Sequence, residues 1–475
     1  MRTSPLIVIT LFLFSACGEN KKEAATVPAT DSLSQHYLDV AVRTANWLQA
    51  TAITTPAGIE WLAHPKDTLP PGYSLYHGST GILVFFLEMY HVTSDTLYRH
   101  LAQKAADNLL AVTADKNSLF FKQQAGSSEW AGLYTGIAGI GFALEEVYQS
   151  CKQKKYHDGM LRCIQLLKDS AKIKDNIASW SDQDDVLAGD AGTGLFLLYA
   201  YEQTKDGSLK DLAAQVGNGL IKKGIKEEEG LKWPMIPGFA RLMPNFSHGT
   251  AGVSYFLVKL YEATGNKEYF QAAAKGANYV KSLAEKNNGL VFHHETDPTF
   301  KGKCTGPACR AKGSCMGKDL FYLGWCHGPA GTGRLFYVME KETGDTIWNH
   351  LIERGNQSMR TTGIPEKLTD GFWNNLGVCC GSAGVGEYQL QLFQQSHNND
   401  YLDFAKHLAG FIEENAVKEG DGLTFPSAEN NRERNVMYTQ TGFMHGAAGI
   451  GMYFLHLHEL SKGIAPAVKL PDDPF

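Results

Sequence analysis

The 475-residue chain lacks the features that mark nucleic-acid-binding or multi-spanning membrane proteins. Its 44 basic residues are outnumbered by 50 acidic ones, and no Lys/Arg-rich block argues for binding by phosphate neutralisation. After the N-terminal segment, no apolar run approaches the ~18 residues that a transmembrane helix needs. Convincing runs of alternating apolar and polar residues, which would predict β-strands, are also missing. With 43% hydrophobic and 11% aromatic residues, the chain is still apolar enough for a large core, which excludes a disordered or collagenous protein.

The one long apolar run lies at the N-terminus. A single basic residue, the run LIVITLFLFSA and small residues before Cys17 are typical of a secretory signal. Cys17 follows Phe14-Ser15-Ala16, which resembles a bacterial lipobox, although that pattern prefers Leu where Phe14 stands. We predict a lipoprotein-type signal peptide at 1–16, lipidation of Cys17, and an exported protein anchored to a membrane and facing the periplasm or cell surface. A plain signal peptide with an incidental cysteine is the alternative. The polar, Pro-containing residues 17–33 are interpreted as a flexible tether.

Glycine is abundant, at 49 residues, and its placement is regular. Seven segments share a small-residue signature: YHGSTG, YTGIAGIG, AGDAGTG, SHGTAG, WCHGPAGTG, CCGSAGVG and MHGAAGIG. The first glycines of these segments are Gly78, Gly136, Gly189, Gly249, Gly328, Gly381 and Gly446. A repeat with a period of 53 to 79 residues decides the fold before any local feature does.

Each motif is followed by about three apolar helical turns, a polar turn, and a second, more amphipathic helix. Helices that are apolar nearly all round favour burial in an inner ring, wrapped by an outer ring. We therefore predict an all-α protein, an α/α toroid with seven inner and seven outer helices, over residues 34–462. The helix at about 34–50 would pair with the last inner helix, and 463–475 would form a C-terminal tail. Equivalent positions should place all glycine-rich turns at one end of the inner ring.

The turns carry most of the candidate chemistry. Their polar side chains are His77, Asp185, His248, Cys326, His327, Cys379, Cys380 and His445. Three thiols from two turns suit a borderline-soft ion such as Zn²⁺, and three ligands would leave open the fourth position typical of catalytic zinc. A strained Cys379–Cys380 disulfide, or thiols simply buried beside glycines, are the alternatives.

These motifs resemble those of lanthionine synthetase C-like proteins, which include the lantibiotic cyclases. The resemblance spans roughly residues 35–460 and depends on the seven turns together with GWCHG at 324–328 and GVCCG at 377–381. It implies an α/α toroid and zinc ligands at Cys326, Cys379 and Cys380, with Cys380 where most members carry His. It also implies a catalytic His248 in the SHG turn, with the acidic partner Asp185. Taken alone, these two residues could equally be a helix-capping histidine and an N-cap aspartate.

The activity implied by the resemblance is zinc-dependent addition of a peptide cysteine thiol to dehydroalanine or dehydrobutyrine, which forms a thioether ring. The substrate would be a peptide with dehydrated Ser/Thr and a free Cys. Some cyclases carry Arg where this chain has Tyr322, and the role of His327 is open. Because the chain carries an export signal, zinc-dependent thiol transfer to other electrophiles is a second reading. A non-catalytic toroid that binds peptide or glycan is a third.

One cysteine-rich segment fits none of the repeats. Cys304, Cys309 and Cys315 lie in an insertion at about 296–318, just before the GWCHG turn. Their spacing suits a small disulfide-tied loop in an oxidising compartment, with a second metal site as the alternative. Cys151 and Cys163 are interpreted as buried thiols or a disulfide.

Overall fold

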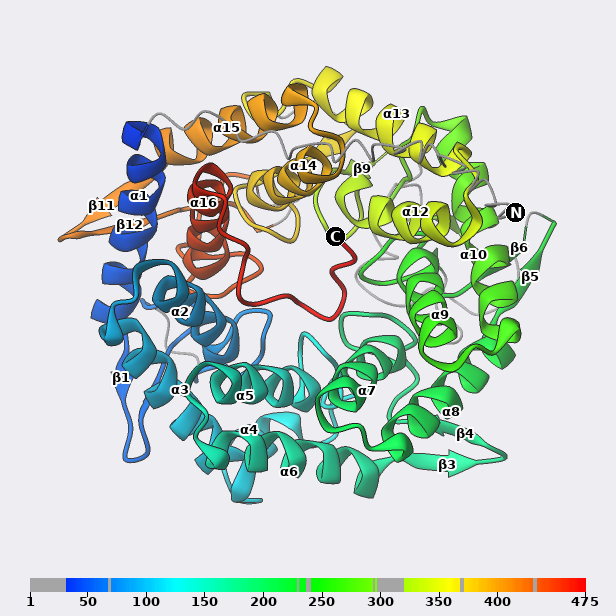
Figure 1. The fold of residues 1–475 in the computed structure, drawn as a ribbon, viewed down its shortest axis with the longest axis horizontal. Helices are drawn as coiled ribbons and strands as arrows, with labels where there is room; N and C mark the ends of the chain where they lie inside the picture. The colour runs from blue at the N-terminus through cyan, green and yellow to red at the C-terminus, as the bar shows by residue number, and fades with distance from the viewer. Residues whose placement is uncertain are drawn as a thin grey trace, which may run out of the picture.

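The protein folds into two concentric rings of helices (Figure 1), which confirms the predicted all-α toroid. The computed structural model describes residues 31–66, 70–228, 230–235, 241–293, 295–296, 320–367, 371–429 and 434–475. The predicted signal peptide, Cys17, most of the tether and the three cysteines of the insertion lie outside these residues. Among the helices described, none combines the length and apolar character that crossing a bilayer requires.

The inner ring contains the helices that follow the glycine motifs. They are α2 (Ser79–Thr93), α5 (Ile137–Cys151), α7 (Asp190–Thr204), α9 (Thr250–Thr264), α12 (Pro329–Thr343), α14 (Ser382–Ser396) and α16 (Ala447–Lys462). Each begins directly after the first glycine of its motif, and all therefore run in the same direction through the ring. Their two-sided burial explains why they are apolar nearly all round.

The outer ring covers the inner one with amphipathic helices. They are α1 (Asp31–Ala50), α3 (Thr96–Ala114), α6 (Lys154–Ser170), α8 (Gly207–Lys223), α10 (Lys267–Lys286), α13 (Ile347–Thr361) and α15 (Asn399–Glu414). Each outer helix packs on the inner helix that precedes it, and α1 packs on α16. The predicted pairing of the first helix with the last inner helix is thus confirmed, and it closes the ring. Helix α1 begins at Asp31, inside the segment interpreted as tether.

Glycines in the inner helices are needed because neighbouring chain comes too close. A Cβ on Gly331 would lie 2.0 Å from the Trp325 carbonyl oxygen, and one on Gly384 would lie 1.9 Å from that of Val378. Gly333, two residues after Gly331, makes room for the ring of Tyr388 on the next inner helix. The glycine signature therefore records where turns and helices approach each other.

Short strands, which the sequence did not predict, mostly follow the outer helices. They are β1 (Ile53–Thr54), β2 (Ile59–Glu60), β3 (Lys172–Lys174), β4 (Ile177–Ser179), β5 (Ile225–Glu227), β6 (Gly230–Lys232), β7 (Arg241–Leu242), β8 (Glu295–Thr296), β9 (Phe321–Tyr322), β10 (Phe372–Trp373), β11 (Val417–Glu419) and β12 (Gly422–Thr424). β9 and β10 pair in parallel, and the other pairs are antiparallel. With two or three residues each, they are too short to show an alternating pattern. The short helix α4 (Leu119–Gln124) lies in the connection from α3 to α5.

The residues after α16 enter the ring. Figure 1 shows this segment, 464–475, crossing the central space from α16 towards α12. Glu88 of α2 accepts the backbone N–H groups of Ala467 and Val468, at 2.8 and 2.9 Å. Further along, Asp472 is fully buried. The segment therefore lies in the central space of the ring, held at one point by Glu88 and at another by the buried Asp472.

Candidate metal and acid–base site

A closed ring of backbone hydrogen bonds joins the seven glycine turns. In each turn, the residue two positions before the motif glycine donates its N–H to the carbonyl of its counterpart in the next turn, at 2.8 to 3.2 Å. In ring order these residues are Tyr76, Tyr134, Leu187, Ser247, Cys326, Cys379 and Met444, and Met444 donates back to Tyr76. The prediction that the turns gather at one end is confirmed. Two of the three candidate metal ligands are members of this ring.

The ring brings the three cysteines together as free thiols. The Sγ atoms of Cys326 and Cys380 are 3.1 Å apart, those of Cys380 and Cys379 are 3.5 Å apart, and all three lie within 4.8 Å of one another. At most 7% of each residue is exposed. Tetrahedral zinc with Zn–S bonds of about 2.3 Å separates its sulfurs by about 3.8 Å, so the cluster has about the size that such an ion needs.

Tyr76 and His445 extend the thiol cluster on one side. The Tyr76 hydroxyl donates to Cys379 Sγ at 2.9 Å and lies 2.8 Å from His445 Nε2. Burial raises the pKa of Cys379, but hydrogen bonds from Cys326, Cys380 and His445 outweigh it and hold that pKa well below the usual range. Cys379 is therefore the thiol of the cluster that is most readily ionised.

Asp185 and His248 form a second pair across neighbouring turns. Asp185 Oδ2 lies 2.7 Å from His248 Nδ1, while its Oδ1 accepts the backbone N–H groups of Ala188 and Gly189, at 2.7 and 2.9 Å. Asp185 thus caps its own turn and orients the histidine of the next one, which leaves His248 Nε2 for a substrate. Burial lowers the pKa of His248, but the Asp185 carboxylate raises it by more, so the net shift is upward.

A row of aromatic rings leads from this pair along the same end. His248 and His327 have ring centroids 5.7 Å apart, His327 and His293 are 4.2 Å apart, and His293 stacks on Tyr322 at 4.5 Å. His293 was missed by the sequence analysis because it lies in no glycine motif. Tyr322, on β9, reaches the site through this row. On the other side, His77 lines a pocket of about 270 Å³ that also contains Tyr73.

Comparisons with known proteins agree with these features. The sequence pattern described as "Lanthionine synthetase C-like protein" matches residues 70–468. The chain belongs to this family. No curated protein sequence matches this lanthionine synthetase C-like protein.

Solved structures match most of the chain, and "Nisin cyclase" shows the same fold. "Nisin cyclase" is 16% identical, with a TM-score of 0.55, and the match covers 91% of this chain and 95% of the cyclase. The GH76 α-mannanase of Bacteroides thetaiotaomicron is 12% identical, with a TM-score of 0.47 and coverages of 89% and 95%. Cellobiose 2-epimerase from Bacillus thermoamylovorans is 10% identical, with a TM-score of 0.49 and coverages of 90% and 99%.

The lanthionine synthetase C-like family implies a zinc ion, and the donor set of this chain fits one. Three buried sulfurs of suitable spacing converge at the turn end, and they are not consumed in a Cys379–Cys380 disulfide. The sequence analysis selected these three residues and the Asp185–His248 pair, and the structure brings the members of each set into contact. Cys151 and Cys163 are free thiols away from this cluster, at the end of α5 and within α6.

Proposed function

We propose that this protein is a zinc-dependent lanthionine cyclase-like enzyme that adds a cysteine thiol to dehydroalanine or dehydrobutyrine in a peptide. One observation carries the proposal: a three-thiol cluster and an Asp–His pair are held on the same hydrogen-bonded ring of turns. The reaction needs both parts. A thiol must become a thiolate, and the α-carbon of the acceptor must receive a proton.

Cys326, Cys379 and Cys380 would hold the zinc ion, leaving a fourth position open to the substrate. When bound, zinc keeps a coordinated thiol ionised at neutral pH, where a free thiol with a pKa near ~8.5 is mostly protonated. Tyr76 and His445 support Cys379 through hydrogen bonds. The seven inner helices begin at this end of the ring, and their N-termini favour negative charge there.

His248 is the proposed proton donor. Attack of the substrate sulfur on the β-carbon forms the C–S bond and breaks the C=C π bond, which places the electron pair at the α-carbon and its carbonyl. Protonated His248 supplies the proton that the α-carbon needs, and the proton lost from the substrate thiol balances it. Asp185 keeps Nδ1 engaged at 2.7 Å and raises the fraction of protonated imidazole, so that Nε2 faces the substrate.

The decisive experiment measures zinc content and cyclisation together. The purified domain should contain about one zinc per chain and should close thioether rings in a dehydrated peptide with a free cysteine, followed by mass spectrometry with thiol alkylation. Zinc with activity only on small thiols and isolated dehydroamino acids would point to thiol transfer. Absence of zinc, with oxidised Cys379 and Cys380, would contradict the proposal and indicate a peptide- or glycan-binding toroid.

We further propose that the enzyme is exported and anchored through a lipid on Cys17. The lipobox-like residues before Cys17 support this. Radiolabelled palmitate should be incorporated into the wild type expressed in a bacterial host and not into Cys17→Ser. Equal labelling of the two, or retention of the unprocessed chain in the cytoplasm, would contradict it.

A further inference from the structure

The C-terminal segment places one buried carboxylate beneath the ring of turns. Asp472 lies three residues from the end of the chain and is fully buried. Its Oδ1 accepts a hydrogen bond from the Tyr134 hydroxyl at 2.8 Å, and its Oδ2 accepts one from Trp325 Nε1 at 2.9 Å. The last residues of the chain are thus bonded to two of the seven turns.

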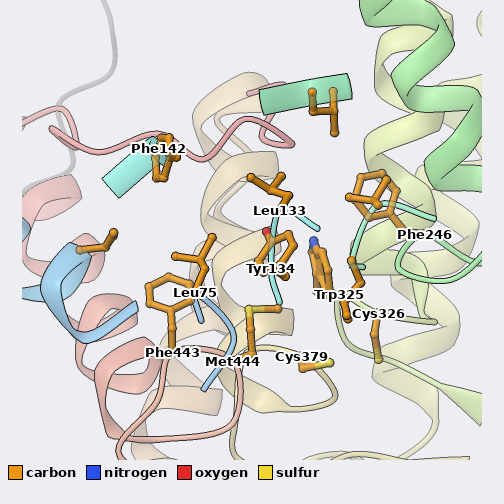
Figure 2. Close-up of a cluster of buried hydrophobic side chains, with 14 of the residues drawn as sticks. Leu75, Leu133, Tyr134, Phe142, Phe246, Trp325, Cys326, Cys379, Phe443 and Met444 are labelled. Carbon is orange, nitrogen blue, oxygen red and sulfur yellow. The ribbon is translucent and has the colours of Figure 1, made fainter. Parts of the chain in front are cut away.

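Both partners of Asp472 belong to the hydrogen-bonded ring or adjoin it. Tyr134 is a ring member, and Trp325 directly precedes the ring member Cys326. In Figure 2 the polar tips of Tyr134 and Trp325 point away from the sulfurs of Cys326 and Cys379. Asp472 therefore contacts the turn from the side opposite to the proposed ligand atoms.

Arg334 fixes Asp472 in turn. The Arg334 guanidinium on α12 donates to the Asp472 backbone carbonyl at 2.9 Å and lies 4.0 Å from its carboxylate. Arg334 also pairs with Asp473, at 3.6 Å, and Asp473 accepts a bond from Gln391 at 3.0 Å. Asp473 thus shares the Arg334 contact with Asp472, whereas the hydrogen bonds to Tyr134 and Trp325 are made by Asp472.

The Trp325 ring packs between two other aromatic rings, and Asp472 accepts its N–H. It is 3% exposed, and its centroid lies 4.8 Å from that of Tyr134 and 5.8 Å from that of Phe246. A buried indole N–H without an acceptor costs about 1–3 kcal/mol, so the ring would shift to find one if Asp472 were absent. Because Trp325 and Cys326 share a peptide bond, that shift would move the Cys326 backbone and its Sγ.

We propose that Asp472 is a positioning residue for the thiol cluster: acting through Trp325 and Tyr134, the end of the chain holds Cys326 in register with Cys379 and Cys380. This inference rests on the proposed zinc site. Asp472 would not contact the metal itself. It would support the metal-binding turn through its hydrogen bonds to Trp325 and Tyr134. Such supporting contacts typically change metal affinity by about 10–100-fold.

The test compares Asp472→Ala, Asp472→Asn and the matched control Asp473→Asn in the full chain. Zinc affinity is measured by competition with a chromogenic chelator, and thermal unfolding is recorded on the metal-free protein. We expect about 10–100-fold weaker zinc binding for Asp472→Ala, a smaller loss for Asp472→Asn, and affinity near wild type for Asp473→Asn. Wild-type affinity in Asp472→Ala, even with a lowered Tm, would overturn the inference and leave Asp472 a purely structural residue.

Trp325→Phe gives a second test that keeps an aromatic ring in the core. It removes the N–H that Asp472 accepts together with part of the indole ring, so Trp325→Phe and Asp472→Asn should weaken zinc binding non-additively, with the double variant close to the weaker single one. Full additivity would contradict the proposed route through Trp325.

A metal-free readout separates this inference from the proposed function. Alkylation of Cys326 by iodoacetamide, followed by peptide mass spectrometry, should be faster in metal-free Asp472→Ala than in metal-free wild type. If wild type binds no zinc but this difference is found, the proposed function fails while the positioning role stands. If wild type binds zinc and the alkylation rates are equal, the positioning role fails alone.

Discussion

The two ends of the inner ring are built from the same seven helices but have opposite electrostatic character. At the turn end, the inner helices begin directly after the turns that carry the thiols and histidines, and helix N-termini favour negative charge. In the half away from the turns, the buried Glu88 and Glu459 and the partly buried Glu387 lie close to one another, with His456 among them. The comparison teaches that the side-chain partners available in each half decide which ionisable groups carry charge there.

The ionisable groups of the far half have strongly shifted pKa values. Burial and the neighbouring Glu88 raise the pKa of Glu459 to about 9, although the nearby His456 opposes the shift. Burial lowers the pKa of His456, but Glu387 outweighs it and raises the value to about 10. At neutral pH this half therefore holds a protonated carboxyl and a charged imidazole, whereas Cys379 at the turn end has a lowered pKa.

Removing a proposed metal ligand at the turn end should have the largest effect on zinc binding and activity. Cys379→Ala leaves two thiols, too few for a stable three-ligand zinc site, and should lose both zinc and cyclisation to background. Metal analysis and peptide mass spectrometry measure the two losses. Cys151→Ala, which removes a free thiol at the end of α5, should retain both. Retained zinc in Cys379→Ala would contradict the assigned ligand set.

Removing the charge of Asp185 should weaken catalysis while the turn stays capped. Asp185→Asn keeps an oxygen for the Ala188 and Gly189 N–H groups but no longer raises the His248 pKa. We expect kcat to fall by about 10²–10⁴-fold, with Asp182→Asn, an exposed neighbour, unchanged. Equal kcat in Asp185→Asn and wild type would remove this pair from the mechanism.

The dependence of kcat on pH in the same variant tests whether His248 is the group that must be protonated. Protonated His248 is the active form, so wild-type activity should fall as pH rises through its elevated pKa, and Asp185→Asn should move that limb to lower pH. The stability from this pair is fully present below the unfolded histidine pKa of ~6.5 and is lost as pH rises through the folded value. An unmoved limb, measured from kcat against pH, would assign the titration to another group.

Glycine substitutions should change stability in opposite directions at the crowded turn end and on the outer surface. A Cβ at Gly384 would lie 1.9 Å from the Val378 carbonyl oxygen, so Gly384→Ala should destabilise the fold by about 2–4 kcal/mol. Gly410 lies in α15, and a Cβ there would meet no atom within 4 Å. Gly410→Ala should therefore stabilise by up to about 1 kcal/mol. Equal effects in urea unfolding would contradict the close approach at Gly384.

A neutral replacement in the far half should have an effect on stability that is small at low pH and grows as the pH rises. The raised pKa of Glu459 means that the folded state loses stability as pH rises from the unfolded value of 4.5 through about 9. Glu459→Gln resembles the protonated form, so it should match wild type at pH 5 and be more stable by about 1–3 kcal/mol at pH 9. Urea unfolding at both pH values measures this, and an equal difference at both would contradict the shift.

The sequence predicted the fold because its signals repeat. Seven glycine motifs with similar following helices identify the ring, the thiols and His248 lie within those motifs, and Asp185 lies three residues before one of them. Residues outside the repeat carry no such signal. His293 precedes the insertion, and Asp472 lies in the short segment 463–475 after the last helix, so their contacts with His327 and Trp325 depend on long-range packing. The short strands escaped detection because two or three residues cannot establish a period.

The hydrogen-bonded ring of turns has an evolutionary consequence. Its bonds use only backbone N–H and C=O groups, and its seven members include tyrosine, leucine, serine, cysteine and methionine. Closure of the barrel therefore places little demand on which side chain stands at each of these positions. Mutation can exchange the reactive groups at this end while the scaffold persists, so descendants of one ancestral toroid could acquire new chemistry by single substitutions.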